Sequence, residues 1–173
     1  MANDPASRGR LPAGLSFFDP VALVSTVGGI GLLPVAPGTW GSLVALPVAW
    51  LIHWALGPLG LVAGVVVVTA VGSWVAGEFG RRSGFVDPGP VVIDEVAGQW
   101  LVLCVAPREV WYWIAGFLLF RAFDIFKPWP AGWADRQVKG GFGVMLDDLI
   151  AALYGAIILY IVVRLAGGAN VFA

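Results

Sequence analysis

The side chains of this chain best suited to chemistry are carboxylates at the ends of long apolar stretches. These carboxylates and the cations that accompany them are Asp94, Glu95, Arg121, Asp124, Lys127, Asp147 and Asp148. A carboxylate beside hydrocarbon is costly unless it is paired, hydrated or bound to a metal. Oxygen ligands without histidine or cysteine suit hard cations such as Mg²⁺, which also binds substrate phosphates. The five carboxylates therefore predict a magnesium site at a membrane surface.

Two cations stand beside these acids. Arg121, Asp124 and Lys127 follow one another at three-residue spacing, so they share one face of a helix. Arginine offers phosphate a bidentate fork and lysine a point charge, which makes hydrolysis of a phosphate assisted by the metal the fitting reaction class. In the alternative interpretation, Arg121 and Asp124 form an internal salt bridge and Lys127 extends to the membrane surface. Asp94 and Glu95 could likewise only cap a helix and occupy its first turn.

Polar or glycine-rich segments precede two of the apolar stretches. In the segment Pro-Gly-Thr-Trp-Gly-Ser at 37–42, Thr39 and Ser42 are candidates to bind a substrate phosphate at the N-terminus of the next helix. A plain N-cap is the alternative for both, because Ser and Thr are expected caps. Glycines precede Asp147 and Asp148, which open the last stretch. Neighbouring side chains on a helix diverge by about 100°, so one aspartate can bind a metal while the other caps the helix.

The composition is that of a membrane protein. Of the 173 residues, 59% are hydrophobic and 12% are charged, whereas a soluble domain carries about 25% charged residues. We expect an all-α, polytopic membrane helical bundle that forms a single domain over 15–173, after a disordered N-terminal tail over 1–14. The net charge of −1 gives no indication of a nucleic-acid partner. Cys104 is the only cysteine, which excludes a disulfide within the chain.

About five stretches are apolar enough to span a membrane, although some are shorter than the roughly 20 residues that a span needs. The expected spans are 41–56, 59–77, 94–106, 110–125 and 148–166. Segment 16–35 is apolar but glycine-rich and ends at prolines, so it predicts an N-terminal interfacial or re-entrant helix. Gly98, in the third span, would let the backbone of another helix come close.

Basic residues alternate between the two sides of these spans. One side carries Arg8, Arg10, Arg81, Arg82, Lys127, Arg136 and Lys139. The turns on the other side carry only Arg108. The positive-inside rule therefore predicts a cytosolic N-terminus, and it brings all the charged clusters to the cytosolic face. His53 lies in the middle of the first span, far from that face, so a mechanism through a phosphohistidine is not expected.

Four segments together resemble the phosphatidylglycerophosphatase A family. They are PGTWGS at 37–42, IDEVAGQW at 93–100, FRAFDIFKPWP at 120–130 and GGFGVMLDD at 140–148. The resemblance implies a Mg²⁺-dependent, multi-pass phosphatase of the bacterial inner membrane that converts phosphatidylglycerol phosphate to phosphatidylglycerol. Its partners would be that substrate and membrane lipid. The functional positions that it implies are Thr39, Asp94, Glu95, Arg121, Asp124, Lys127, Asp147 and Asp148.

A second hypothesis from another class is a small cation transporter or proton-coupled transporter that uses the same acids. Transporter sites usually lie near the midplane of the bilayer, on interrupted helices and often within internal repeats. This sequence has no such repeat, and its acids gather toward one surface. The pattern therefore favours the hydrolase.

Overall fold

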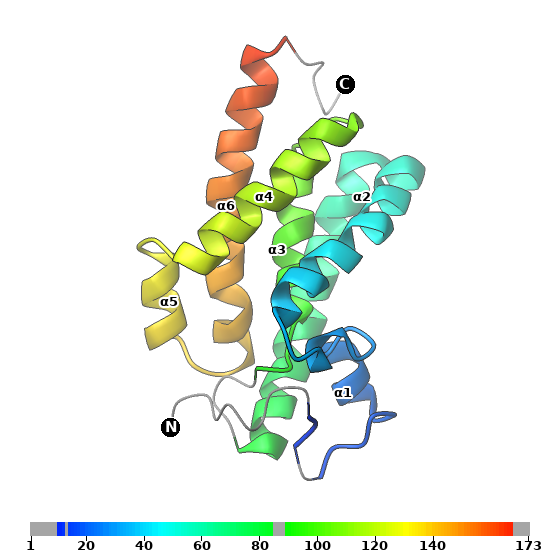
Figure 1. Ribbon diagram of the computed structural model, residues 1–173, viewed down its shortest axis with the longest axis vertical. Coiled ribbons are helices and arrows are strands. Elements are labelled where there is room, and N and C mark those ends of the chain that lie inside the picture. Colours follow the sequence, from blue (N-terminus) through cyan, green and yellow to red (C-terminus); the bar gives the residue numbers. More distant parts are fainter. Residues whose placement is uncertain (1–9, 13, 85–88, 168–173) are drawn as a thin grey trace.

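A computed structural model describes residues 10–12, 14–84 and 89–167, and every element within them is helical. The elements are α1 (Pro20–Ser25), η2 (Ile30–Leu32), α2 (Pro37–Ser83), α3 (Ile93–Leu103), α4 (Val110–Phe126), α5 (Ala131–Gln137) and α6 (Gly141–Leu165). Figure 1 shows the long helices packed together, with the short α1 near the lower end and α5 beside α6. The expected all-α class is confirmed for the described residues.

The longest helix, α2, is a hairpin of two arms. Gly57 has φ 68° and ψ −169°, which interrupts the helix, and Pro58 follows without a backbone donor. Both arms meet the same residue of α3: the indole Nε1 of Trp100 donates to the carbonyl oxygen of Ala45 at 3.0 Å, and its ring lies against Gly64. The arms therefore run antiparallel, and they match the expected stretches on either side of Gly57.

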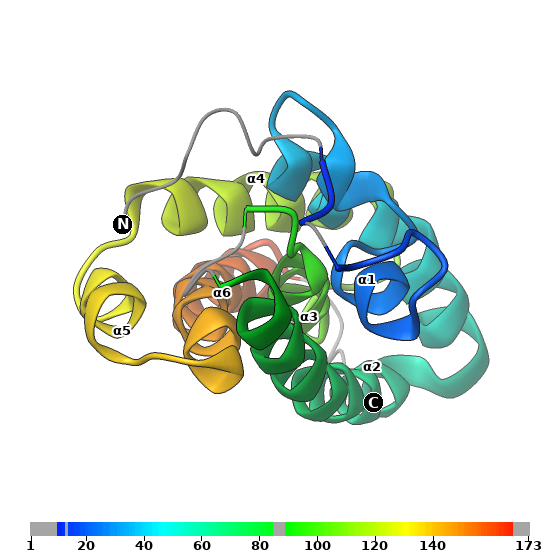
Figure 2. The same cartoon turned by 90° about the horizontal axis from the view of Figure 1, so that it is seen from below.

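Helix α3 lies in the middle of the molecule and carries Asp94 and Glu95 in its first turn. It contacts α2, α4 and α6, and Figure 2 shows these helices around it. Its fully buried residues include Ala97, Val102 and Leu103, which belong to the main hydrophobic core. With 11 residues, α3 is about 16 Å long at 1.5 Å per residue, roughly half the thickness of a bilayer's hydrocarbon.

Two helices, α2 and α6, are long and apolar enough to cross a membrane. In the most apolar window of α2, only 22% of the residues are buried inside the protein, so most of this surface is free to contact lipid. Large exposed apolar residues on the two helices include Leu51, Trp54, Leu56, Leu59, Val66, Trp74, Ile157 and Ile161. Length and apolar surface together indicate association with a membrane.

Several expected boundaries were wrong. Helix α6 begins at Gly141 with Gly140 as its N-cap, so Asp147 and Asp148 lie in its second turn and do not open it. The glycines there are helical because α6 packs closely on α2, where the Gly141 backbone meets the backbone oxygen of Ser73. Helix α5, between the fourth and fifth expected spans, was not predicted.

The N-terminal segment 16–35 is not one helix. It forms α1 and η2, which are separated by a turn in which Val27, Gly28 and Gly29 all have positive φ. This segment covers the start of α3, since the backbone N–H of Val92 donates to the carbonyl of Ser25 at 2.9 Å.

The expected N-terminal tail falls mostly on residues 1–9 and 13, which lie outside the described residues. Of its described part, Leu11 packs against the core. A disordered tail over 1–14 stays a prediction, as does the single domain over 15–173.

Candidate active site

A pocket of about 190 Å³ lies among the first turn of α3, the end of α4, α5 and the start of α6. Its charged lining consists of Asp94, Glu95, Asp124, Lys127, Asp135, Lys139, Asp147 and Asp148. All five carboxylates expected from the sequence therefore face one cavity, although they come from three helices. Six acidic side chains against two lysines leave the pocket strongly negative.

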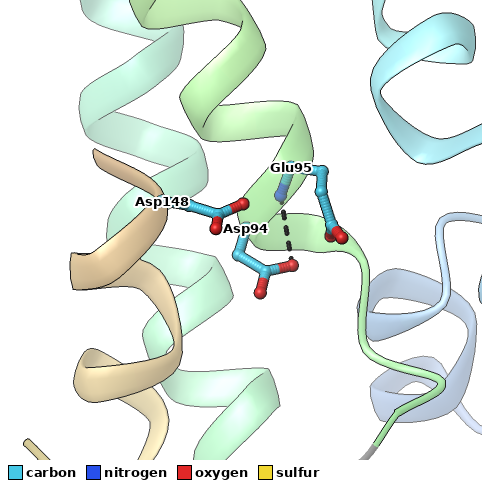
Figure 3. A group of neighbouring side chains, drawn as sticks. All are labelled: Asp94, Glu95 and Asp148. Atoms are coloured by element: carbon cyan, nitrogen blue, oxygen red, sulfur yellow. Dashed lines mark hydrogen bonds between the residues drawn. The ribbon is translucent and has the colours of Figure 1, made fainter. Parts of the chain in front are cut away.

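Three of these carboxylates form a tight group, drawn in Figure 3. Ligand oxygens of Asp94, Glu95 and Asp148 all lie within 4.8 Å of one another. Asp94 and Glu95 occupy the first turn of α3, and Asp148 reaches toward them from α6. Such a spacing allows one cation to contact all three side chains.

Local backbone structure explains why Asp94 and Glu95 point here. The N-cap of α3 is Val92, so the interpretation of Asp94 as a simple cap is wrong. Its Oδ1 instead accepts the backbone N–H of Glu95 at 3.1 Å. Acids in a first turn are favoured by the helix dipole. That placement fixes both carboxylates at the end of α3 that faces the pocket.

Gly98 allows α6 to come close enough to complete the group. A Cβ built on Gly98 would lie 3.3 Å from the backbone oxygen of Asp148 and 2.5 Å from the Phe120 ring. Any side chain here would push α4 or α6 away from α3. The expectation that another helix backbone approaches Gly98 is confirmed.

Arg121 lies behind the carboxylates and does not line the pocket. Its Nη1 pairs with Oδ2 of Asp124 at 2.5 Å and lies 3.9 Å from Oε1 of Glu95. The same nitrogen donates to Oγ of Ser42 at 3.3 Å. The internal salt bridge between Arg121 and Asp124, which was the alternative interpretation of the sequence, is therefore present. From outside the pocket, Arg121 contacts two of its acids, Asp124 and Glu95.

Thr39 and Ser42 also lie outside the lining of the pocket. The N-cap of α2 is Ala36, so neither residue caps this helix as the alternative interpretation required. Ser42 is fully buried, and its hydroxyl donates to the carbonyl of Gly38 at 2.9 Å while it accepts from Arg121. No hydrogen bond joins the Thr39 hydroxyl to another described residue. A direct phosphate contact from either side chain stays a prediction.

Lys127 enters the pocket because it follows α4 in a left-handed conformation, with φ 41°. Its Nζ donates to Oδ2 of Asp147 and to Oδ1 of Asp135, the latter at 3.0 Å. Burial works against the charged ammonium, but the charge and hydrogen bond of Asp147 and the hydrogen bond of Asp135 outweigh it. The pKa of Lys127 is therefore raised. The Lys127 ammonium is thus paired with acids of the pocket, and whether it lies at a membrane surface stays a prediction.

Three buried carboxylate oxygens have no hydrogen-bond partner among the described residues. They are Oε2 of Glu95, Oδ1 of Asp147 and Oδ2 of Asp148. Buried polar atoms are normally satisfied, so each orphan calls for an explanation. A hard cation fits the oxygens of Glu95 and Asp148, which belong to the tight group, because it takes carboxylate oxygens and needs no histidine or cysteine.

Two charged residues of the lining, Asp135 and Lys139, were not among the site residues expected from the sequence. Both lie between the segments 120–130 and 140–148, where Lys139 served only to orient the spans and Asp135 was not used. Their position on the side that carries the charged clusters was the available signal. What the sequence lacked was α5, which turns Asp135 toward Lys127.

His53 lies away from the pocket, as expected. It is buried, and its backbone oxygen accepts from Arg108 at 3.5 Å. The ring of Trp113 lies 5.8 Å from its own ring. Arg108 follows the far end of α3, so this cluster marks the end of the molecule opposite the carboxylates.

Comparison with known proteins gives consistent matches over most of the chain. Residues 23–163 match the family described as Phosphatidylglycerophosphatase A. A protein of that name from Escherichia coli (strain K12) is 38% identical over 152 residues, which cover 86% of each chain. One from Haemophilus influenzae is 35% identical over 147 residues, covering 84% of this chain and 90% of the relative.

A third relative carries a different name. A Bacteroides thetaiotaomicron protein, named as a candidate phosphatidylinositol-3-phosphatase, is 40% identical over 145 residues. The match covers 79% of this chain and 89% of that protein. No solved structure matches the chain.

Proposed function

This chain belongs to the phosphatidylglycerophosphatase A family, and we propose that it hydrolyses the terminal phosphate of phosphatidylglycerol phosphate, giving phosphatidylglycerol and inorganic phosphate. Its two relatives with the family name are phosphatases, so the chain is an enzyme of that class. The observation that carries the proposal is the group of Asp94, Glu95 and Asp148 beside the pocket. Ionised carboxylates this close repel one another, and a cation among them would offset that repulsion.

We propose Mg²⁺ as that cation. Asp94, Glu95 and Asp148 would hold it, and Asp124 and Asp147 lie within electrostatic reach of Asp94. The set contains only oxygen donors, and two of its buried oxygens, Oε2 of Glu95 and Oδ2 of Asp148, have no partner among the described residues. When bound, Mg²⁺ would polarise a phosphoryl oxygen and so favour attack at phosphorus.

The chain's own residues would bind the phosphate and move a proton. Lys127 lies in the pocket with a raised pKa, so it stays charged, and a phosphate oxygen would compete with Asp147 and Asp135 for its ammonium. Arg121 would keep Asp124 and Glu95 in place through the contacts behind the pocket. Oδ1 of Asp147 has no partner among the described residues, and a carboxylate there can accept the proton of an attacking water.

We propose that the chain spans the bacterial inner membrane about five times, with the pocket at the cytosolic face. The spans would be the two arms of α2 together with α3, α4 and α6. Arg81, Arg82, Arg136 and Lys139 belong to the connections on the pocket side, and Arg108 belongs to the opposite side. This asymmetry supports a cytosolic pocket by the positive-inside rule. Because α3 is short, its ends would lie in a thinned or hydrated region.

The transporter hypothesis is not favoured. The matched family and the first two relatives are named as phosphatases, and none of the names describes a transporter. The carboxylates also gather near helix ends, in the first turn of α3 and the last turn of α4. Transport sites usually lie near the midplane of the bilayer.

The activity is tested with purified protein in mixed micelles. Phosphatidylglycerol phosphate and Mg²⁺ should release inorganic phosphate, a chelator should stop the release, and added Mg²⁺ should restore it. Phosphatidylinositol 3-phosphate is assayed in parallel, because one relative is named for that headgroup. Preference for the inositol lipid would change the proposed substrate. If the folded protein releases no inorganic phosphate and conducts cations in liposomes, the transporter hypothesis would be favoured instead.

The metal is tested separately from turnover. Mn²⁺, used as a spectroscopic probe for Mg²⁺, should bind the wild-type protein and be displaced by Mg²⁺. Glu95→Gln should weaken this binding by about tenfold or more, because it removes a charged ligand. Unchanged Mn²⁺ affinity in that variant would show that the metal does not bind at the group of Asp94, Glu95 and Asp148.

A further inference from the structure

We propose that Lys139 binds the phosphodiester group of the lipid substrate at the mouth of the pocket. The proposal rests on the function proposed above, because it concerns a second part of the same substrate. Lys139 lies in the segment that joins α5 to α6, where it lines the pocket with its side chain exposed. Asp124, Asp147 and Asp148 are buried. Lys139 therefore lies at the mouth, while these carboxylates form the floor.

The charges of the pocket explain why Lys139 matters. A substrate with two phosphates is strongly anionic, yet six of the charged residues in the lining are acids. A metal ion would compensate only the floor. Arg121 cannot receive the lipid from within the pocket, since it does not line it and already binds Asp124 and Ser42. Among the described residues, the cations of the lining are the two lysines.

The two lysines have different partners. Lys127 is held by Asp147 and Asp135, so its charge is largely balanced by carboxylates of the pocket. Lys139 forms no ion pair or hydrogen bond with any other described residue. Among the cations of the lining, it is the one whose charge is available without breaking an existing pair.

The chemistry of the substrate assigns the contact. Phosphatidylglycerol phosphate carries a terminal monoester and an internal diester, which are separated by a glycerol unit. The monoester has to reach the carboxylates of the floor for hydrolysis. The diester remains attached to the part of the lipid that carries the acyl chains, so it stays nearer the mouth. An ammonium there would bind a diester oxygen through a charge-assisted hydrogen bond.

The test is the steady-state kinetics of Lys139→Gln with phosphatidylglycerol phosphate. We expect KM to rise about fivefold to tenfold and kcat to stay within about twofold, because an exposed contact to the diester contributes to binding and little to the chemical step. Lys139→Arg should keep a KM close to that of the wild type. A fall in kcat with unchanged KM would overturn the proposal, since Lys139 would then act on the terminal phosphate.

Arg136→Gln is the matched control. Arg136 is exposed, lies three positions before Lys139 and does not line the pocket. Its loss removes the same charge from the same surface, so KM should not change. An equal rise of KM in both variants would mean general attraction to an anionic surface and would overturn the proposal. An equal rise in Lys139→Arg and Lys139→Gln would also overturn it.

Two competing lipids separate the phosphates of the substrate. Phosphatidylglycerol keeps the diester and lacks the monoester, whereas phosphatidic acid has only a monoester. Lys139→Gln should weaken inhibition by phosphatidylglycerol and leave inhibition by phosphatidic acid unchanged. Equal effects on both lipids, or no inhibition of the wild type by phosphatidylglycerol, would contradict the assignment. If the wild-type protein releases no phosphate at all, the proposed function fails; if only the variant's KM is unchanged, the inference about Lys139 fails alone.

Discussion

Asp147 and Asp148 are adjacent in the chain but have different surroundings in the pocket. Oδ2 of Asp147 accepts from Lys127, whereas Asp148 faces Asp94 and Glu95 across the gap between α6 and α3. Side chains of neighbouring residues on a helix diverge by about 100°. The two carboxylates can therefore have different roles: Asp147 pairs with Lys127, and Asp148 is available to bind a metal.

Asp148→Asn should lower phosphate release by on the order of 100-fold or more, because it removes a charge from the proposed metal ligands. The fold should survive, since asparagine has the same shape and the change removes repulsion among crowded acids. Turnover is measured at saturating Mg²⁺, and folding by thermal unfolding in detergent. Glu109→Gln, an exposed acid at the far end of the molecule, should leave turnover unchanged. Full activity of Asp148→Asn would show that the Asp148 carboxylate is not needed for turnover.

Lys127→Gln should lower stability, because the mutation leaves Asp147 buried without its cation. We expect a loss of about 1–3 kcal/mol in the free energy of unfolding, less than for a fully buried pair because Lys127 is partly exposed. The second change Asp147→Asn should restore part of the loss. Chemical unfolding in detergent measures the wild type and both variants, and equal stability of Lys127→Gln and the wild type would contradict the role of the pair.

The stability contributed by the pair of Lys127 and Asp147 depends on pH. A raised pKa means that the stability from the Lys127 ammonium is fully present below the ordinary lysine pKa of about 10.4 and is lost only as the pH rises through the raised value. The difference in unfolding free energy between the wild type and Lys127→Gln should therefore not fall between pH 7 and pH 9 through loss of the lysine proton.

At the scale of elements, the site depends on how closely three helices approach. Asp94 and Glu95 come from the start of α3, Asp124 from the end of α4, and Asp148 from the second turn of α6. Gly98 lies one turn beyond Asp94, where the ring of Phe120 and the backbone of α6 close on α3. A small residue at this position is therefore a condition for bringing the carboxylates together.

Gly98→Ala should destabilise the protein by about 1–3 kcal/mol, since the added methyl group overlaps the Phe120 ring in a packed core. Gly77→Ala is the matched control: it is also a glycine in a helix, but its added Cβ would meet its nearest neighbour at an ordinary 3.4 Å. That variant should keep or slightly raise the melting temperature, because alanine favours the helix. Equal destabilisation by both changes would rule out the specific contact.

The positions of helices could be predicted from the sequence where the helices follow apolar runs. Helix ends that depend on packing against other helices could not. The two arms of α2 and helix α4 lie close to the expected stretches 41–56, 59–77 and 110–125. The start of α6 was missed because glycine-rich residues 140–143 have a weak helix preference by themselves. Contact with α2 makes this stretch helical, and contacts between distant segments are not visible in a local pattern.

The whole molecule has two chemically different ends. One end holds the acidic pocket, and the other holds His53, Arg108 and Trp113. Between them, α2 and α6 expose apolar side chains along their length. Such a distribution fits a protein that lies across a membrane with its polar pocket at one surface.

The proposed orientation predicts labelling from opposite sides. In a Cys104→Ser background, which removes the only cysteine, single cysteines are introduced by Arg136→Cys and Glu109→Cys. Both positions are exposed. In intact cells, a thiol reagent that does not cross the membrane should label position 109, and position 136 only after the membrane is opened. Labelling of both from the same side would contradict the five-span arrangement.

The sequence alone determined the class of the protein and the kinds of residue in its site. Apolar runs that end in charges predicted helices in a membrane, and the segments at 37–42, 93–100, 120–130 and 140–148 were enough to indicate the family. These properties are readable because they depend on composition and on spacing along one segment. The five carboxylates could be named for the same reason.

Only the tertiary structure decided which cations face the pocket. Arg121 and Lys127 share a helix face by spacing, yet Arg121 binds Ser42, 79 positions away, and Lys127 turns to Asp147. The only sign for Lys139 in the sequence was that it lies on the side of the charged clusters, and it lines the pocket because α5 and α6 place it there. Helix periodicity sets the direction of a side chain along its own helix, whereas its partner depends on how distant helices pack.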